Sequence, residues 1–325
     1  MQRLPRAVVS NLREVHVTPN QRLYMVVCSL AFACGNSPQE AVVTEDALSA
    51  GEVVNRVHRV RSQVGIGGGA GNLVDHGGRV TPAINFYVIY WGTGFVSTTP
   101  SLVNSFLGGL GSSGYWTIDS QYLRGAANSA AFQASWTDTS APGSVVLDTD
   151  IQAEVSKAIN GGHLPYDSKG LYFVLTPPSS TVCIANSIPP ACSCAVFCGY
   201  HTNYTAAGHG TVLYSSIPSP AACPSSCSWQ STTPTGNLEA DAAVSIIAHE
   251  AEETQSDSLA NAWYDASGNE NGDKCAWKFG PTQTAANGAA YNQTWGGSNW
   301  LVQMNWSNSI SGCAQKGPTD GPYTQ

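Results

Sequence analysis

Charged side chains are scarce in this chain: Asp, Glu, Lys and Arg make up 11% of its 325 residues, and the formal net charge is −8. This acidic balance argues against nucleic acid or an anionic membrane surface as the partner, because both attract positive charge. No uninterrupted apolar run of about 20 residues occurs, so we predict no conventional transmembrane helix. The chain also lacks a G-x-S-x-G elbow, a Walker loop and a papain-like cysteine context, which leaves serine, phosphate and thiol chemistry without support.

Apolar residues, by contrast, make up 42% of the chain, which is too apolar for a disordered protein. We predict a signal or lipoprotein signal segment over residues 1–34, because four arginines precede an apolar run at 23–33 that ends in small residues. A buried strand or helix is the alternative for this run. Cys34 follows the small residues, so a lipid anchor at Cys34 is an alternative to free secretion. We predict a flexible leader over residues 35–79, which contains a glycine-rich stretch.

Cysteine usage supports export. Ten cysteines occur, and six of them lie between positions 183 and 227. Once Cys28 is removed with the signal segment and Cys34 is assigned to cleavage or to the lipid anchor, an even set of eight remains, which is typical of disulfides in an oxidising compartment. The spacings in CSCAVFC and CPSSC differ from the usual C-x-x-C zinc knuckles, so disulfides are preferred over zinc there. We expect a secreted or extracytoplasmic protein with disulfide-rich loops.

The folded part is predicted to be a single mixed-sheet α/β domain over residues 80–325. Apolar and β-branched runs predict strands at residues 84–92, 144–148, 171–177 and 211–217. Apolar spacing with start and stop signals predicts helices at residues 100–110, 148–160 and 238–256. A hairpin is expected to turn at Gly296 and Gly297.

The helix at 238–256 carries the pattern that points to chemistry. His249 and Glu253 are four residues apart on one helix face, and Glu250 lies beside them, which gives H-E-x-x-E. H-E-x-x-H at this spacing supplies two zinc ligands and a general base, so we expect a zincin-like active-site helix. A Glu in the second ligand position adds negative charge and damps the acidity of the metal. Glu252 shares the face and could replace Glu253.

A metal site needs a third ligand, and downstream residues could supply it. Glu270 follows Glu253 by 17 residues, close to the spacing of zinc peptidases whose third ligand is Glu. Asp257 lies farther along the same face and would reach the ion only if the chain turns back. Acids and asparagines around Gly268 could instead wrap calcium. Additional candidate ligands are His201, Asp265 and Asp273.

Three functions remain open at this level. In the first, His249 and Glu253 bind zinc and Glu250 takes a proton from water at the metal, so that a peptide or other acyl carbonyl is hydrolysed. In the second, the protein binds cell-wall glycan or another surface partner through exposed aromatics, and the acidic segment binds calcium or nothing. For the helix taken alone, a solvated and idle acidic face is the alternative to a metal site. In the third, zinc only stabilises the fold. The aromatics considered are Trp91, Trp263, Tyr264, Trp295 and Trp300.

A series of sequence strings, taken in order, resembles the phosphate-induced protein, or Exordium, family. The strings are VDHGGRV, FYVIYWG, LYFVLT, FCGYHTNY, CPSSC, AVSIIAHEAEE with the segment up to CAWKFG, and WLVQMNW with GCA. The resemblance extends in order from about residue 72 to residue 314, roughly three quarters of the chain. The resemblance implies a secreted, extracellular or wall-associated protein, tied in plant members to growth and to phosphate or hormone responses. It brings no settled biochemical activity.

Within that family the chain is similar to the microbial branch, in which H-E-x-x-E is followed by T-D-P, A-W-Y-D and G-N-E-N-x-D-K-C. Plant members generally lack the His-Glu pair. The matching residues are His249, Glu250, Glu253, Asp257, Trp263, Tyr264, Asp265, Asn269, Glu270, Asp273 and Cys275. Ser258 replaces the proline, which weakens the expectation that a sharp turn carries Asp257 into the site. The resemblance favours a metal site, but it does not imply catalysis.

Overall fold

The computed structural model describes residues 57–63, 71–184 and 190–317. The predicted signal segment, Cys34 and most of the predicted flexible leader lie outside the described residues, so the domain boundaries stay predictions. Among the residues described, no helix has both the length and the apolar character that a membrane crossing needs.

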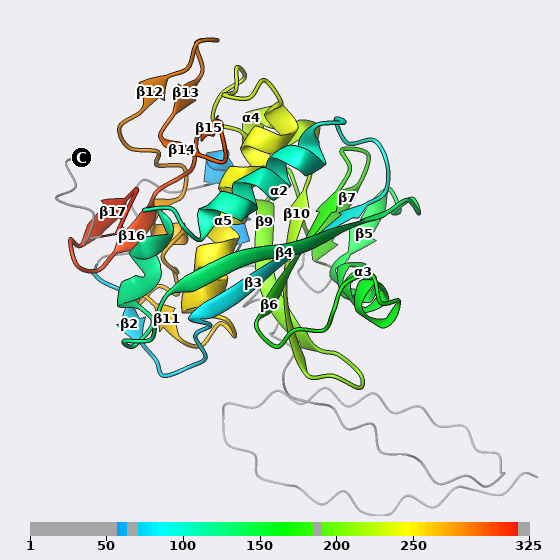
Figure 1. Cartoon of the computed structure of the whole chain (residues 1–325), viewed down its shortest axis with the longest axis horizontal. Helices are drawn as coiled ribbons and strands as arrows, with labels where there is room; N and C mark the ends of the chain where they lie inside the picture. Colours follow the sequence, from blue (N-terminus) through cyan, green and yellow to red (C-terminus); the bar gives the residue numbers. More distant parts are fainter. Residues whose placement is uncertain (1–56, 64–70, 185–189, 318–325) are drawn as a thin grey trace, which may run out of the picture. The chain divides into compact units, whose positions relative to one another are not determined.

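A six-stranded mixed sheet lies at the centre of the described residues, in the order β1-β9-β10-β6-β3-β4 (Figure 1). The strands are β1 Val57–Arg59, β3 Ala83–Trp91, β4 Ser129–Asp138, β6 Gly170–Thr176, β9 Phe197–Thr205 and β10 Thr211–Pro218. β3 runs parallel to β4 and β6, and β6 runs parallel to β10, whereas β9 is antiparallel to β10 and β1. β6 is buried throughout, as the apolar run at 171–177 predicts for a central parallel strand.

Helices cover both faces of this sheet (Figure 1). α2 (Thr99–Leu110) and α5 (Leu238–Ser256) pack against one face, where the core includes Phe173. α3 (Asp148–Asn160) packs against the other face, where Val174 joins the core. Successive side chains of a strand point to opposite faces, so the two cores alternate along β6. The expectation of a mixed α/β fold and of these three helices is confirmed.

Smaller elements surround the central layers. The prediction of a strand at 144–148 is confirmed by β5 (Val145–Leu147), which forms a separate three-stranded sheet with β7 (Thr181–Ile184) and β8 (Ala191–Cys192), in the order β5-β7-β8. The hairpin at Gly296 and Gly297 is confirmed, and both glycines have positive φ angles, as a tight hairpin turn requires. The remaining elements are β2 Val74–Asp75, β5 Val145–Leu147, β7 Thr181–Ile184, β8 Ala191–Cys192, α4 Pro224–Cys227, β11 Trp263–Tyr264, β12 Gln283–Thr284, β13 Ala290–Tyr291, β14 Gln293–Trp295, β15 Ser298–Trp300, β16 Asn305–Ser307 and β17 Gly312–Ala314, with short 3₁₀ turns η1 Arg61–Gln63, η2 Trp116–Gln121, η3 Pro220–Ala222 and η4 Asp273–Cys275.

Four disulfides join all eight cysteines of the predicted set. The pairs are Cys183–Cys192, Cys194–Cys223, Cys198–Cys227 and Cys275–Cys313. Three of them lie around β7, β9 and α4, and the fourth ties η4 to β17. The disulfide prediction is confirmed, and such bridges are typical of extracytoplasmic proteins.

Helix α5 differs from a surface helix because it is buried on every side. Asn237 caps its start by accepting a hydrogen bond from the Ala240 N–H at 3.1 Å, as its sequence predicts. The expected solvated acidic face is absent from it: His249, Glu250, Glu252 and Glu253 are 0% exposed. The alternative of an idle, solvated helix face is therefore wrong. Buried carboxyl groups are costly unless they are paired or bind a metal, so this face needs partners.

Candidate metal centre

The buried face of α5 meets β9 and the chain between β11 and η4 at a cluster of histidines and carboxylates. Their side chains are almost fully inaccessible, and the most exposed of them, Asp273, has an 11% exposed side chain. α5 supplies His249, Glu250 and Glu253, β9 supplies His201, and the chain after β11 supplies Glu270 and Asp273. The cluster thus joins residues up to 72 positions apart, from His201 to Asp273.

His249, Glu253 and Asp273 form one potential ligand group. The Nε2 atom of His249 lies 3.1 Å from Oε1 of Glu253 and 3.8 Å from Oδ1 of Asp273. One donor atom from each residue lies within 4.8 Å of the others, so a single ion could contact all three. The Asp273 N–H donates to Glu253 Oε1 at 2.9 Å, which holds the loop against the helix.

A second potential ligand group consists of His201, Glu253 and Glu270. One donor atom from each of these residues also lies within 4.8 Å of the others. The Nε2 atom of His201 is 3.7 Å from Oε1 of Glu270, and its Nδ1 atom is 3.6 Å from Oε2 of Glu253. Nδ1 also lies 3.1 Å from Oε2 of Glu250. The predicted ligands are therefore brought together, but Glu270 groups with His201, and Asp273 takes the place beside His249.

The residues present fit a divalent metal ion. Among the residues described, His249 Nε2 and Glu250 Oε1 are buried without a hydrogen-bond partner. Although His249 Nε2 is close to Glu253, the two atoms do not have hydrogen-bond geometry. Each unsatisfied buried polar atom costs about 1–3 kcal/mol, a cost that a coordinated cation would remove. Imidazole and carboxylate donors together suit first-row divalent ions such as zinc or manganese, whereas calcium prefers oxygen ligands alone.

The electrostatic state of the cluster also suits a cation. Burial, with repulsion from His201, lowers the pKa of His249 to about 3, so its ring is neutral and can act as a ligand. Burial raises the pKa of Glu250 well above its usual range, and the Asp273 charge adds to this effect. Burial and the charge of Glu253 raise the pKa of Asp273 in the same way. A divalent cation would offset the repulsion among the carboxyl groups and favour their ionised form.

Gln303 holds the His249 ring in place. Its Nε2 atom lies against Nδ1 of His249 and donates to the Gly272 carbonyl at 3.1 Å, while its Oε1 atom accepts the Trp277 N–H at 3.1 Å. If the Gln303 amide donates to Nδ1, then Nδ1 is the acceptor and the ring proton is on Nε2. Metal binding through Nε2 requires the amide oxygen of Gln303 to face Nδ1 instead, because a ligating histidine donates its other N–H.

Three acids that the sequence offered as ligands have other partners. Asp257 Oδ1 accepts the N–H groups of Asn261 and Ala262 at 2.5 and 2.6 Å, so Asp257 shapes the turn after α5. Asp265 pairs with the buried Lys274 ammonium at 3.0 Å and accepts two backbone N–H groups of its own loop. Glu252 points elsewhere and accepts from the Asn305 amide at 2.7 Å. None of the three belongs to either ligand group found in the described residues.

His58 is a neighbour of the centre that sequence reasoning missed. It lies on β1, within the predicted flexible leader, and is 1% exposed. Its ring stacks on His249 with centroids 4.3 Å apart and on Trp277 at 5.0 Å. A three-residue strand has too short a pattern to be recognised from sequence, and only the valines around His58 hinted at it.

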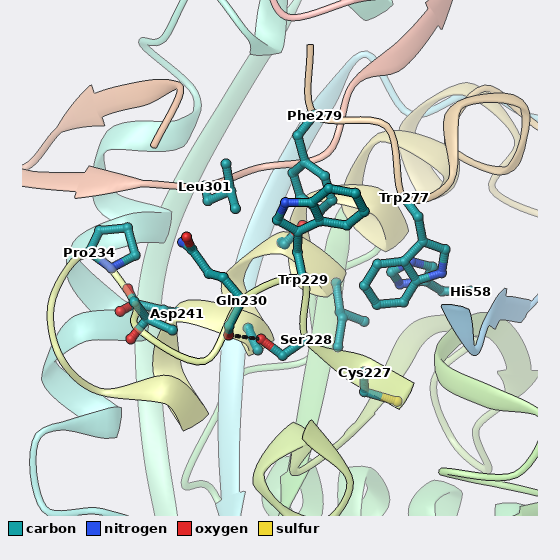
Figure 2. Close-up of a pocket in the computed structure, with 14 residues that line it drawn as sticks. His58, Cys227, Ser228, Trp229, Gln230, Pro234, Asp241, Trp277, Phe279 and Leu301 are labelled. Atoms are coloured by element: carbon teal, nitrogen blue, oxygen red, sulfur yellow. Dashed lines mark hydrogen bonds between the residues drawn. The ribbon is translucent and has the colours of Figure 1, made fainter. Parts of the chain in front are cut away.

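His58 also lines a pocket, which is shown in Figure 2. Aromatic rings of Trp229, Trp277 and Phe279 line it, together with the polar side chains of Gln230 and Asp241. Trp229 is 44% exposed, whereas His58 is buried. Since His58 stacks on His249, one imidazole ring separates this pocket from the candidate metal ligands.

Gly272 lets the loop pass close to the ligands, which gives a first prediction. A Cβ at this position would lie 2.7 Å from His249 Nδ1 and 2.9 Å from Glu253 Oε1. Gly272→Ala is expected to weaken metal affinity by about tenfold or more, as displaced supporting groups do. Titration with a competing chelator measures the change. Gly108→Ala in α2 is the control, because its Cβ would meet no atom within 4 Å; equal affinities in both variants would contradict the packing described.

The Cys275–Cys313 disulfide gives a second prediction, because Cys275 follows Asp273 by two residues. Replacing both cysteines with serine is expected to lower the free energy of unfolding by about 2–4 kcal/mol. It should also weaken metal binding, since the loop that carries Asp273 loses its tether. Replacing Cys183 and Cys192 is the matched control and should leave metal affinity unchanged. Loss of stability without any difference in metal affinity between the two variants would count against the role of this tether.

Comparison with known proteins places the chain in a family. The family model of the phosphate-induced protein 1 conserved region matches residues 73–316, which include β2 to β17 and all six side chains of the cluster. The chain is 26% identical over 302 residues to Protein EXORDIUM-like 5 of Arabidopsis thaliana, covering 78% of this chain and 80% of that protein. No solved structure matches it. The resemblance found in the sequence is confirmed, and the chain belongs to the phosphate-induced protein 1 family.

Proposed function

We propose that this protein is an exported metal-dependent hydrolase in which α5 is a zincin-like active-site helix. The observation that carries the proposal is the convergence of two histidines and several carboxylates on Glu253, deep in the fold. His249, Glu253 and Asp273 would hold the ion beside Glu250, and His201 and Glu270 lie on the other side of Glu253. Zinc is the proposed metal. The four disulfides support export.

Glu250 is the proposed general base. One of its oxygens, Oε2, contacts His201 Nδ1, and the other, Oε1, has no hydrogen-bond partner among the residues described. Oε1 is the oxygen proposed to accept a proton from water in the centre. When bound, a divalent cation supplies Lewis-acid chemistry, polarising a carbonyl oxygen and making water more acidic. Burial of the cluster excludes bulk water, which strengthens these electrostatic interactions.

The proposed substrate is a peptide or a cell-wall glycan, and the aromatic pocket is the proposed route to the centre. Trp229, Phe279 and Trp277 offer flat apolar faces of the kind on which sugar rings and apolar side chains pack. His58 lines this pocket and stacks on His249, so in this proposal the His58 ring moves aside to let the substrate reach the ion.

His58→Ala is accordingly expected to speed the release of metal to an added chelator, because a methyl group replaces the ring that covers His249. The rate is measured by the colour change of a metal-sensitive chelating dye. Trp229→Ala, at the exposed end of the pocket, serves as the control and should release metal at the wild-type rate. If both variants release metal no faster than the wild type, the route does not pass His58.

The function is tested with the secreted protein and Glu250→Gln, assayed against peptide and cell-wall glycan substrates. We expect the wild type to hydrolyse one of these classes and the variant to keep its metal while losing about 10²–10⁴-fold in rate, as removal of a general base does. Equal rates in the two proteins would exclude Glu250 from this role. Absence of hydrolysis by a metal-loaded wild type would leave the metal a stabilising part of the fold.

The second candidate is a non-catalytic binding protein for cell-wall glycan, and the aromatic pocket with its exposed Trp229 favours it. The aromatics offered by the sequence suit it less: Trp300 is 0% exposed, and Trp295 packs on Phe106 with centroids 5.1 Å apart. Glycan pull-down separates the candidates, because Glu250→Gln should leave binding intact. Trp229→Ala should weaken such binding.

A further inference from the structure

We propose that the centre holds two divalent metal ions bridged by the carboxylate of Glu253. This inference rests on the proposed function, because it specifies how many ions the same centre binds and how they share ligands. One ion lies with His249 and Asp273, and the other with His201 and Glu270.

The two oxygens of Glu253 face different histidines. Oε1 lies 3.1 Å from His249 Nε2, and Oε2 lies 3.6 Å from His201 Nδ1. Glu253 also belongs to both ligand groups, in which the further carboxylate is Asp273 beside His249 and Glu270 beside His201. A carboxylate that offers one oxygen to each of two ligand groups has the geometry of a bridge between ions about 3.5–4 Å apart.

The donors form two groups and do not merge into one. Each group contains one imidazole and one further carboxylate besides Glu253, and the groups share no other residue. A single ion in either group would leave a histidine and a carboxylate of the other group without a metal. Three protein ligands per ion also leave positions open for water or substrate, as in catalytic centres.

Charge balance favours two ions. The cluster contains four carboxylates, Glu250, Glu253, Glu270 and Asp273, next to two histidines that ligate as neutral rings. Two divalent cations would offset all four negative charges. One cation would offset only half of this charge, so the other carboxyl groups would have to remain neutral in the buried site.

Glu250 completes the second ion's surroundings. Its Oε2 atom lies 3.1 Å from His201 Nδ1, so a proton on Nδ1 would leave Nε2, 3.7 Å from Glu270 Oε1, as the nitrogen that binds the ion. This is the carboxylate–histidine–metal arrangement that orients ligating imidazoles. Two bridged ions of this kind can stabilise the attacking and the leaving groups of a hydrolysed peptide bond together.

The test is metal stoichiometry in the full-length secreted protein, stripped of metal and reloaded with zinc alone. We expect two equivalents of zinc in the wild type and one each in His201→Gln and Asp273→Asn, read by native mass spectrometry. Glu252→Gln is the matched control, because it is adjacent to Glu253 on α5 but faces Asn305, and it should keep two equivalents.

Manganese loading gives an independent readout that does not depend on whether the variants fold. Two Mn²⁺ ions bridged by one carboxylate are magnetically coupled, so the wild type should give the multiline resonance spectrum of a coupled pair. One equivalent of zinc with the spectrum of isolated Mn²⁺ would overturn the two-ion centre and leave the proposed hydrolase standing. No bound zinc or manganese would overturn both.

Discussion

Glu253→Gln is expected to empty the metal centre and to abolish hydrolysis. Glu253 contacts both histidines, through Oε1 to His249 and through Oε2 to His201, so its replacement weakens every ligand group at once. A neutral amide is a poorer ligand for a divalent cation than a carboxylate. We expect metal affinity to fall by more than the roughly 10–100-fold caused by losing an outer-shell partner. Zinc content after dialysis and the rate of substrate hydrolysis measure the two effects.

Glu252→Gln is the control for this experiment because Glu252 is equally buried on the same helix. Its carboxylate contacts the Asn305 amide and not the histidines, so zinc content and rate should remain at the wild-type level. Retention of zinc by Glu253→Gln, or an equal loss of zinc from Glu252→Gln, would contradict the role of Glu253 as the shared ligand.

Removal of the metal is expected to lower the melting temperature strongly. A ligand that binds only the folded state at about 1,000 times its dissociation constant adds roughly 4 kcal/mol to the free energy of unfolding. For a domain of this size that corresponds to on the order of 10 °C. The carboxylates left behind repel one another in a buried site, which adds to the loss. Calorimetry with and without EDTA measures the shift.

Two comparisons show whether this shift comes from the centre. Glu253→Gln should melt at the same temperature with and without EDTA, because it holds no metal to remove. Addition of zinc or manganese to the stripped wild type should restore the melting temperature, and calcium should restore it less, since the ligand groups contain imidazole. A shift of equal size in Glu253→Gln would assign the stabilising ion to another place in the protein.

Helices and strands whose apolar periodicity and capping residues lie within their own segment can be predicted from the sequence. The helix at 238–256 was recognised because a capping Asn237, acids in its first turn and an uninterrupted apolar pattern all occur within its own sequence. The buried strands near 84–92 and 171–177 were recognised because parallel strands covered on both faces have continuous apolar runs. β4 and β9 were missed, since β4 is partly exposed along its length and β9 is polar and lies in the Cys-rich region.

The candidate site was only half predictable, because its geometry depends on contacts between distant segments. Spacing alone placed His249, Glu250 and Glu253 on one face, but it indicated neither that the face is buried nor which acid lies beside His249. Glu270 has the familiar spacing, yet the chain between β11 and η4 turns so that Asp273 lies beside His249.

Asp257 and His58 show the same limit. The sequence raised Asp257 as a ligand on the condition that the chain turns back. The chain does turn after α5, but Asp257 stabilises this turn by accepting hydrogen bonds from the backbone N–H groups of Asn261 and Ala262. His58 approaches His249 only because β1 pairs with β9, and a short edge strand carries almost no pattern of its own.

The most direct test of the central claim is the metal content of the secreted protein and of His249→Ala, measured by plasma mass spectrometry after exhaustive dialysis. The account predicts bound transition metal in the wild type and a clear loss of it in the variant, with the disulfide-linked fold retained. Equal, near-zero metal in both proteins would contradict the account.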